Sequence, residues 1–100
     1  MKWKKKTVVS CNNLTVLSGT NCPMGGDAGH GGKTIVQFID DAATCWNIYV
    51  NGNKIEENPE KITIELLGDS ECETIIEALD FAAKSLRTIY NKNKENDDNT

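Results

Sequence analysis

The feature that most constrains the fold is an amphipathic pattern near the C-terminal end of the chain. Ser70 and, three residues later, Glu73 form a capping-box sequence, so a helix is expected to begin there and to continue to about Tyr90. On its charged face, Asp80 and Lys84 have the spacing of an i,i+4 ion pair. Apolar residues recur at spacings of three and four, the period of a helix with one buried face; they are Cys72, Ile75, Ile76, Leu79, Ala82, Ala83, Leu86 and Ile89.

Such a helix cannot bury its apolar stripe alone, and the rest of the chain supplies strand-like partners. The segments with strand character are 3–9, 14–17, 33–40, 45–50 and 61–67. The last two alternate apolar and polar residues, as half-buried strands do, and Asn51-Gly52 is a strong turn signal. We therefore predict an α+β fold, an antiparallel sheet of four or five strands with one C-terminal helix packed across one face.

Length and charge limit the function classes. A chain of 100 residues with 38% hydrophobic content fits one globular domain, predicted over residues 1–90, followed by a polar tail, 91–100, that is expected to be disordered. The net charge of -4 disfavours coating of nucleic acid. No segment has the length of a membrane span or of a signal-peptide core, so a cytoplasmic protein without a membrane contact is expected.

The four cysteines are widely spaced and contain no CxxC, which indicates unpaired thiols in a reducing compartment. Cys45 and Cys72 fall on apolar faces of their predicted elements. Core packing is therefore the expected role of these two thiols.

The most unusual segment is NCPMGGDAGHGGKT, residues 21–34. It resembles a phosphate-binding loop, in which a glycine precedes Gly-Lys-Thr by five positions and the loop opens a helix. Here the fifth position before Gly32 is Asp27, whose carboxylate would repel a phosphate, and the residues after Thr34 have strand character. A nucleotide hydrolase of that class is therefore not expected.

A less specific hypothesis needs no exact spacing. Glycines let backbone N–H groups converge into an anion-binding nest, and a small anionic ligand such as a nucleotide would suit the charged and polar side chains nearby. An aromatic side chain on the neighbouring strand would stack on a base. The alternative is a mobile surface loop. The candidate ligand-binding residues are Gly25, Gly26, Asp27, Gly29, His30, Gly31, Gly32, Lys33, Thr34, Asn47 and Tyr49.

Other chemistries receive weaker support. Cys22, Asp27 and His30 are too few N and S ligands for a structural zinc site, so no metal or cofactor is expected. Cys22 with His30 as base lacks a rigid group to orient the base, so no catalytic residue is assigned. The carboxylate pairs at 40–41 and 56–57 lie on expected turns and are interpreted as solvated charge.

The segments CPMGGDAGHGGKT and LLGDSECETIIEALDFA together resemble small uncharacterised proteins carried by phages and prophages. This resemblance implies a setting in the host cytoplasm. It also implies a counter-defence role, either sequestering a nucleotide signal or covering the surface of a host defence protein. It transfers no functional residue.

The leading prediction is a non-catalytic protein that sequesters a small anionic ligand, a nucleotide or cyclic nucleotide signal. A homo-oligomer is expected, because one loop on a small sheet buries little of a ligand. The alternative is an acidic interaction module that binds a basic host protein, such as a nucleic-acid-binding defence protein, through acidic residues near the start of the helix: Asp69, Glu71, Glu73, Glu77 and Asp80. A small nucleotide hydrolase using His30 is the third possibility.

Overall fold

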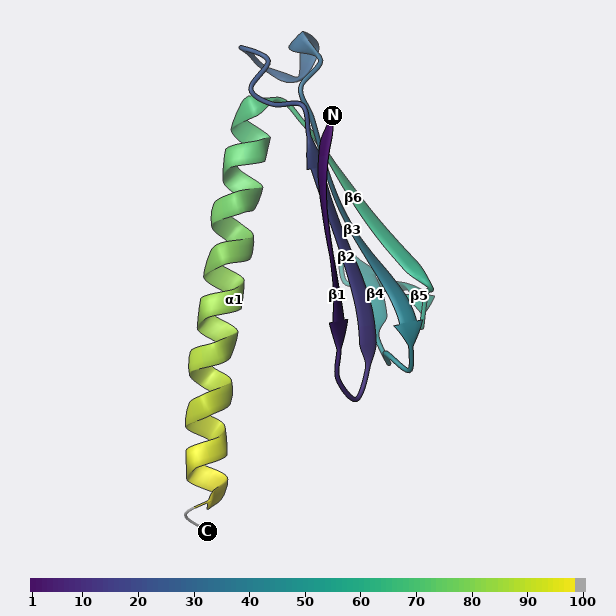
Figure 1. The fold of residues 1–100 in the computed structure, drawn as a ribbon, viewed down its shortest axis with the longest axis vertical. Coiled ribbons are helices and arrows are strands. Elements are labelled where there is room, and N and C mark those ends of the chain that lie inside the picture. Colours follow the sequence, from purple (N-terminus) through teal and green to yellow (C-terminus); the bar gives the residue numbers. More distant parts are fainter. Residues whose placement is uncertain (99–100) are drawn as a thin grey trace.

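The computed structural model describes residues 1–98 as two antiparallel sheets and a long C-terminal helix (Figure 1). The larger sheet has the strand order β1-β2-β3-β6, formed by β1 (Lys2–Val9), β2 (Asn13–Thr20), β3 (Lys33–Ala42) and β6 (Lys61–Leu67). The remaining main elements are β4 (Asn47–Val50) paired with β5 (Asn53–Glu57), and α1 (Asp69–Asp98). The predicted α+β class, antiparallel sheet and C-terminal helix are confirmed.

β1 and β2 form a hairpin, with Val8 paired to Leu14 across the turn. β2 is longer than expected and continues to Thr20, because its polar residues still pair with β3 on the other side. β5 was not predicted. Its sequence, NKIEE, lacks apolar alternation, and all of its residues are exposed. The turn at 51–52 is nevertheless correct, and it makes β4 and β5 a hairpin separate from the main sheet.

One face of the main sheet is apolar in its two central strands and in β6. Val16 pairs with Phe38, and Phe38 pairs with Ile62, so these three side chains lie in one row across the sheet. Val36 and Ile64 form a neighbouring row on the same face. We call this surface the inner face, because Val36 lines the groove that the sheet forms with α1.

The helix is longer than its apolar pattern indicates. It continues past Tyr90 to Asp98, so residues 91–98 of the predicted disordered tail are helical, while residues 99–100 lie outside the described part of the chain. This extension contains Lys92, Lys94 and Glu95, which favour a helix, but also five Asn and Asp residues, which do not, so helix propensity alone does not explain it. The helix meets the sheet mainly at β3 and β6. Figure 1 shows the helix leaving its start near the sheet and ending beyond the strands.

The helix also begins differently from the prediction. The Gly68 carbonyl accepts the amide of Cys72 at 3.3 Å, which makes Gly68 the N-cap position, and α1 starts at Asp69. Ser70 therefore lies inside the first turn, where its carbonyl accepts the Thr74 hydroxyl at 2.8 Å. The expected cap at Ser70 is wrong, because a hydrogen bond from the Gly68 amide to the Gly32 carbonyl fixes the residue that precedes the helix.

Few apolar side chains are fully buried. Among the described residues, Val36 and Cys72 are the buried hydrophobic ones, at 4% and 7% exposure. Cys72 thus has the predicted core position, whereas Cys45 is exposed in the link between β3 and β4, and all four cysteines are free. The apolar stripe of α1 is largely exposed beyond Cys72. The chain leaves much of its own apolar surface uncovered.

Candidate functional site

The glycine-rich segment is an ordered loop between β2 and β3, fixed at its base by Asn21. The Asn21 side chain donates to the Gly31 carbonyl at 3.0 Å and accepts the Lys33 amide at 2.7 Å. The Asn21 backbone amide also donates to the Lys33 carbonyl at 3.2 Å. Asn21 is not among the residues predicted for the site, although an asparagine beside a glycine-rich loop is a common signal for side-chain to backbone bonding.

Three backbone amides at the start of the glycine loop converge, and they hold a carboxylate of the same chain. Asp69 accepts the amide of Met24 at 2.9 Å, that of Gly25 at 2.8 Å and that of Gly26 at 3.3 Å. These hydrogen bonds, led by the one from Met24, hold the pKa of the Asp69 carboxyl below its usual value. An external anion would have to displace Asp69 from these amides.

Backbone contacts strengthen this attachment. The Asp69 amide donates to the Gly26 carbonyl at 3.2 Å, and the Gly68 amide donates to the Gly32 carbonyl at 2.9 Å. A side chain at Gly32 would place its Cβ 3.1 Å from the Cys22 sulfur and 3.2 Å from an Asp69 oxygen. We call the contacts between residues 21–32 and residues 68–69 the loop clasp. The clasp fixes where the helix starts.

The one histidine is paired within the loop. His30 Nδ1 lies 3.0 Å from Asp27 Oδ1, which also accepts the Gly29 amide at 2.9 Å. The hydrogen bond with His30, followed by that from Gly29, lowers the pKa of the Asp27 carboxyl. Asp27 caps the short 3-10 turn η1 (Ala28–His30), and both side chains of the pair face solvent. The pair organises the exposed tip of the loop.

The remaining predicted site residues lie apart from this tip. Thr34 is buried, and its hydroxyl is 2.9 Å from that of Thr20. Lys33 begins β3, whereas Asn47 and Tyr49 belong to β4, which follows the other end of β3. Ten residues of β3 separate the two ends by about 30 Å. The structure therefore does not bring Tyr49 beside the glycine loop.

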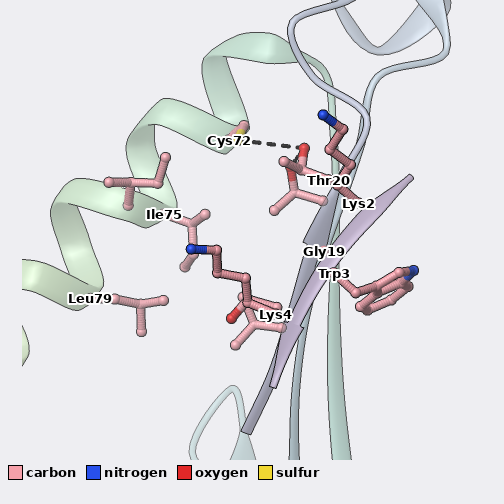
Figure 2. Close-up of a pocket in the computed structure, with 12 residues that line it drawn as sticks. Lys2, Trp3, Lys4, Gly19, Thr20, Cys72, Ile75 and Leu79 are labelled. Atoms are coloured by element: carbon pink, nitrogen blue, oxygen red, sulfur yellow. Dashed lines mark hydrogen bonds between the residues drawn. The ribbon is translucent and has the colours of Figure 1, made fainter. Parts of the chain in front are cut away.

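An apolar groove lies below the loop clasp, between α1 and the inner face. It has a volume of about 600 Å³, and its walls include Val36 from the sheet and Ile75 and Leu79 from the helix. Figure 2 shows Ile75 and Leu79 projecting from the helix toward the sheet, with Lys4 extending into the same space and Trp3 turned away. Cys72 closes one end, 3.7 Å from the Thr20 hydroxyl. We call this space the helix groove.

A second groove, of about 830 Å³, lies between the β4–β5 hairpin and the far end of the inner face. Its lining brings together three aromatic side chains: Phe38 from β3, Trp46 just before β4, and Tyr49 within β4. Trp46 is held by a hydrogen bond of 2.6 Å from its indole N–H to the Pro59 carbonyl. Lys61 borders the same space. We call it the hairpin groove.

The outer side of α1 carries a further exposed feature. Phe81 lies off the apolar stripe and is 73% exposed, with Glu77 one turn before it. The predicted pair of Asp80 and Lys84 is confirmed at 2.8 Å. Phe81 is not among the residues predicted for the site, although an aromatic residue outside the apolar period of a helix is itself a signal of surface exposure.

The chain matches no family model, and comparison with curated proteins and with solved structures gives no match either. Within residues 1–98, no cluster of three or more His, Cys, Asp or Glu side chains is arranged to hold a metal ion. The described part of the chain also contains no helix that is both long and apolar enough to cross a membrane.

Proposed function

We propose that this protein is a non-catalytic binding protein that takes a small molecule with a planar, apolar body, such as a nucleotide, into the hairpin groove. The observation that carries the proposal is the gathering of Phe38, Trp46 and Tyr49 around one concave space. Binding sites for small molecules are typically clefts of about 300–1,000 Å³, lined by apolar and aromatic side chains with a few polar groups.

The aromatic lining suits a flat ring, because stacking on Tyr or Trp contributes about 1–3 kcal/mol for a nucleobase. Tyr49 is 57% exposed, so its ring is accessible to a ligand. Trp46 is half-buried, and its bond to Pro59 holds the indole in place. Lys61 at the border supplies a positive charge for an anionic group. This is the same ligand class that the sequence predicts, at a different place.

The test is a titration of the purified protein with a panel of mononucleotides and cyclic nucleotides. Trp46 is one of two tryptophans, so ligand in the hairpin groove is expected to quench indole fluorescence and to raise the melting temperature. Tyr49→Ala is expected to weaken binding by about tenfold or more. Phe81→Ala, on the outer side of α1, is the matched control and should bind normally. No response to any nucleotide at millimolar concentration would remove this proposal.

The acidic interaction module remains a second candidate, favoured by the exposure of Phe81 beside Glu77. Aromatic anchors within a charged surface are typical of binding hot spots. We would expect salt-sensitive binding of a basic protein that is lost in Glu77→Lys with Phe81→Ala. The control is reversal of Glu56 and Glu57 on the hairpin. Binding that the control abolishes equally would argue against the helix as the contact surface.

A further inference from the structure

We propose that the apolar stripe of α1 binds the same stripe of a second copy of the chain, with the two helices antiparallel about a two-fold axis. The partner's C-terminal half then enters the helix groove. This inference is independent of the hairpin groove, which lies at the other end of the inner face.

The apolar stripe is symmetric about a midpoint from Ile75 to Tyr90. Measured from the midpoint between Ala82 and Ala83, the stripe residues from Ile75 onward each have an apolar counterpart at the same distance on the other side, whereas Cys72 corresponds to the polar Asn93. The pairs are Ala82 with Ala83, Leu79 with Leu86, Ile76 with Ile89, and Ile75 with Tyr90. A two-fold axis through that midpoint places each residue at the height of its counterpart in the other copy, which is the requirement of a self-complementary interface.

The sizes of these residues fit a helix crossing. Alanines at the centre allow the two backbones to approach to the usual 8–10 Å, and larger side chains fill the space on either side. The stripe is available for such a contact, because Ile76 is 59% exposed and Leu86 is 65% exposed. Over residues 75–90 the contact is about 24 Å long.

The charged residues beside the stripe fix the direction of the partner helix. One flank of the stripe carries a charged residue every seven positions, acidic in the first half and basic in the second: Glu73, Asp80, Arg87 and Lys94. In an antiparallel pair, this flank of one helix lies beside the same flank of the other helix. Measured along the helix axis, Asp80 then lies about 3 Å from Arg87 of the second copy. Glu73 lies equally close to Lys94 of the second copy. A parallel pair would place the two acidic halves side by side and provide none of these pairs.

The helix groove offers apolar surface to the second copy. Leu79 lines it and Ile76 borders it, and their counterparts in the pair are Leu86 and Ile89. The second copy therefore brings apolar side chains to an apolar space of about 600 Å³ that the chain does not fill by itself. A standard interface buries about 800 Å² from each partner, and the groove adds sheet surface to what the two helices bury alone.

The test is the mass of the full protein in solution, measured by native mass spectrometry and by light scattering at about 100 µM. The expected mass is twice the 11.0 kDa of one chain. Leu86→Glu is expected to give a monomer with unchanged circular dichroism, because Leu86 is already largely exposed. Phe81→Glu, on the opposite side of the helix, is the matched control and should remain dimeric.

A charge exchange tests the direction. Asp80→Arg and Arg87→Asp should each weaken the dimer by about fivefold or more, and the double variant should restore it. A wild-type monomer overturns the proposal, as does a monomer that carries a co-purified apolar ligand. A dimer that the double variant weakens further overturns the antiparallel direction. Nucleotide binding is tested with Tyr49→Ala and dimer formation with variants of α1, so either proposal can fail without the other.

Discussion

The carboxylate of Asp69 accepts the backbone amide of Gly25 at 2.8 Å, although 44 positions separate the two residues in the chain. The bond joins the loop between β2 and β3 to the first residue of α1. Because the helix meets the sheet mainly at β3 and β6, near its own start, the loop clasp contributes to the direction in which the helix leaves the sheet.

Asp69→Ala should therefore lower stability at neutral pH, and this loss should shrink in acid. The folded-state pKa of Asp69 lies below the ordinary value of about 3.9. Its contribution is thus complete above that value and disappears as the pH falls through the lower, folded-state pKa. Urea unfolding of both proteins between pH 7 and pH 2 measures the effect. Asp27→Ala is the comparison, because its lowered pKa arises from the exposed loop tip. A stability difference between wild type and Asp69→Ala that stays constant across this range would contradict the assignment.

Gly68→Ala should be more damaging than Gly52→Ala. Both glycines have positive φ, at 102° and 79°, where an alanine costs about 1–2 kcal/mol. A Cβ at Gly52 meets nothing within 4 Å, whereas at Gly68 it would lie 3.1 Å from the Ala28 amide nitrogen and overlap the Glu71 carboxylate. Equal losses of unfolding free energy in the two variants would show that the clasp is not tightly packed.

Asn21→Ala removes two hydrogen bonds at the base of the glycine loop. At about 1 kcal/mol for each bond, the melting temperature should fall by about 5 °C or more. Asn21→Asp keeps the acceptor for the Lys33 amide and loses the donor to Gly31, so its loss should be intermediate. Asn47→Ala, on exposed β4, serves as the control and should melt close to the wild type.

Trp46→Phe should destabilise the protein by about 1 kcal/mol, because the indole donates to the Pro59 carbonyl and a phenyl ring cannot. The loss is expected in chemical unfolding followed by circular dichroism. Trp3→Phe is the control. The Trp3 indole lies over Gly19, where any Cβ would overlap it, and it is turned away from the helix groove. A larger loss in Trp3→Phe than in Trp46→Phe would argue against the role given to the Pro59 contact.

Local periodicity accounts for what the sequence predicts well. Two patterns are local, because each reflects which nearby residues share one face of an element. They are the alternation of Ile62 and Ile64 with polar residues and the helical spacing from Cys72 to Ile89. Both patterns are confirmed. β5 escaped prediction because its pairing with β4, rather than any apolar pattern, keeps it extended.

The candidate site could be predicted only in part. Glycine content indicated a nest of amides, yet the carboxylate that fills it, Asp69, comes from a distant position that no local pattern connects to Gly25. Tyr49 was selected as an aromatic ligand contact, and it does line a groove. Tyr49 lies far from the glycine loop because the ten-residue strand β3 separates them. That separation is visible only in the three-dimensional topology.

The sheet ends at β1, and this strand has consequences for how copies of the protein can associate. The unpaired backbone groups of an edge strand can form hydrogen bonds with a strand of another molecule. Lysines on the edge strand oppose this pairing. β1 carries Lys2, Lys4, Lys5 and Lys6, so two like edges repel each other. Edge-to-edge pairing of the β1 strands of two copies is thereby opposed at this border of the sheet.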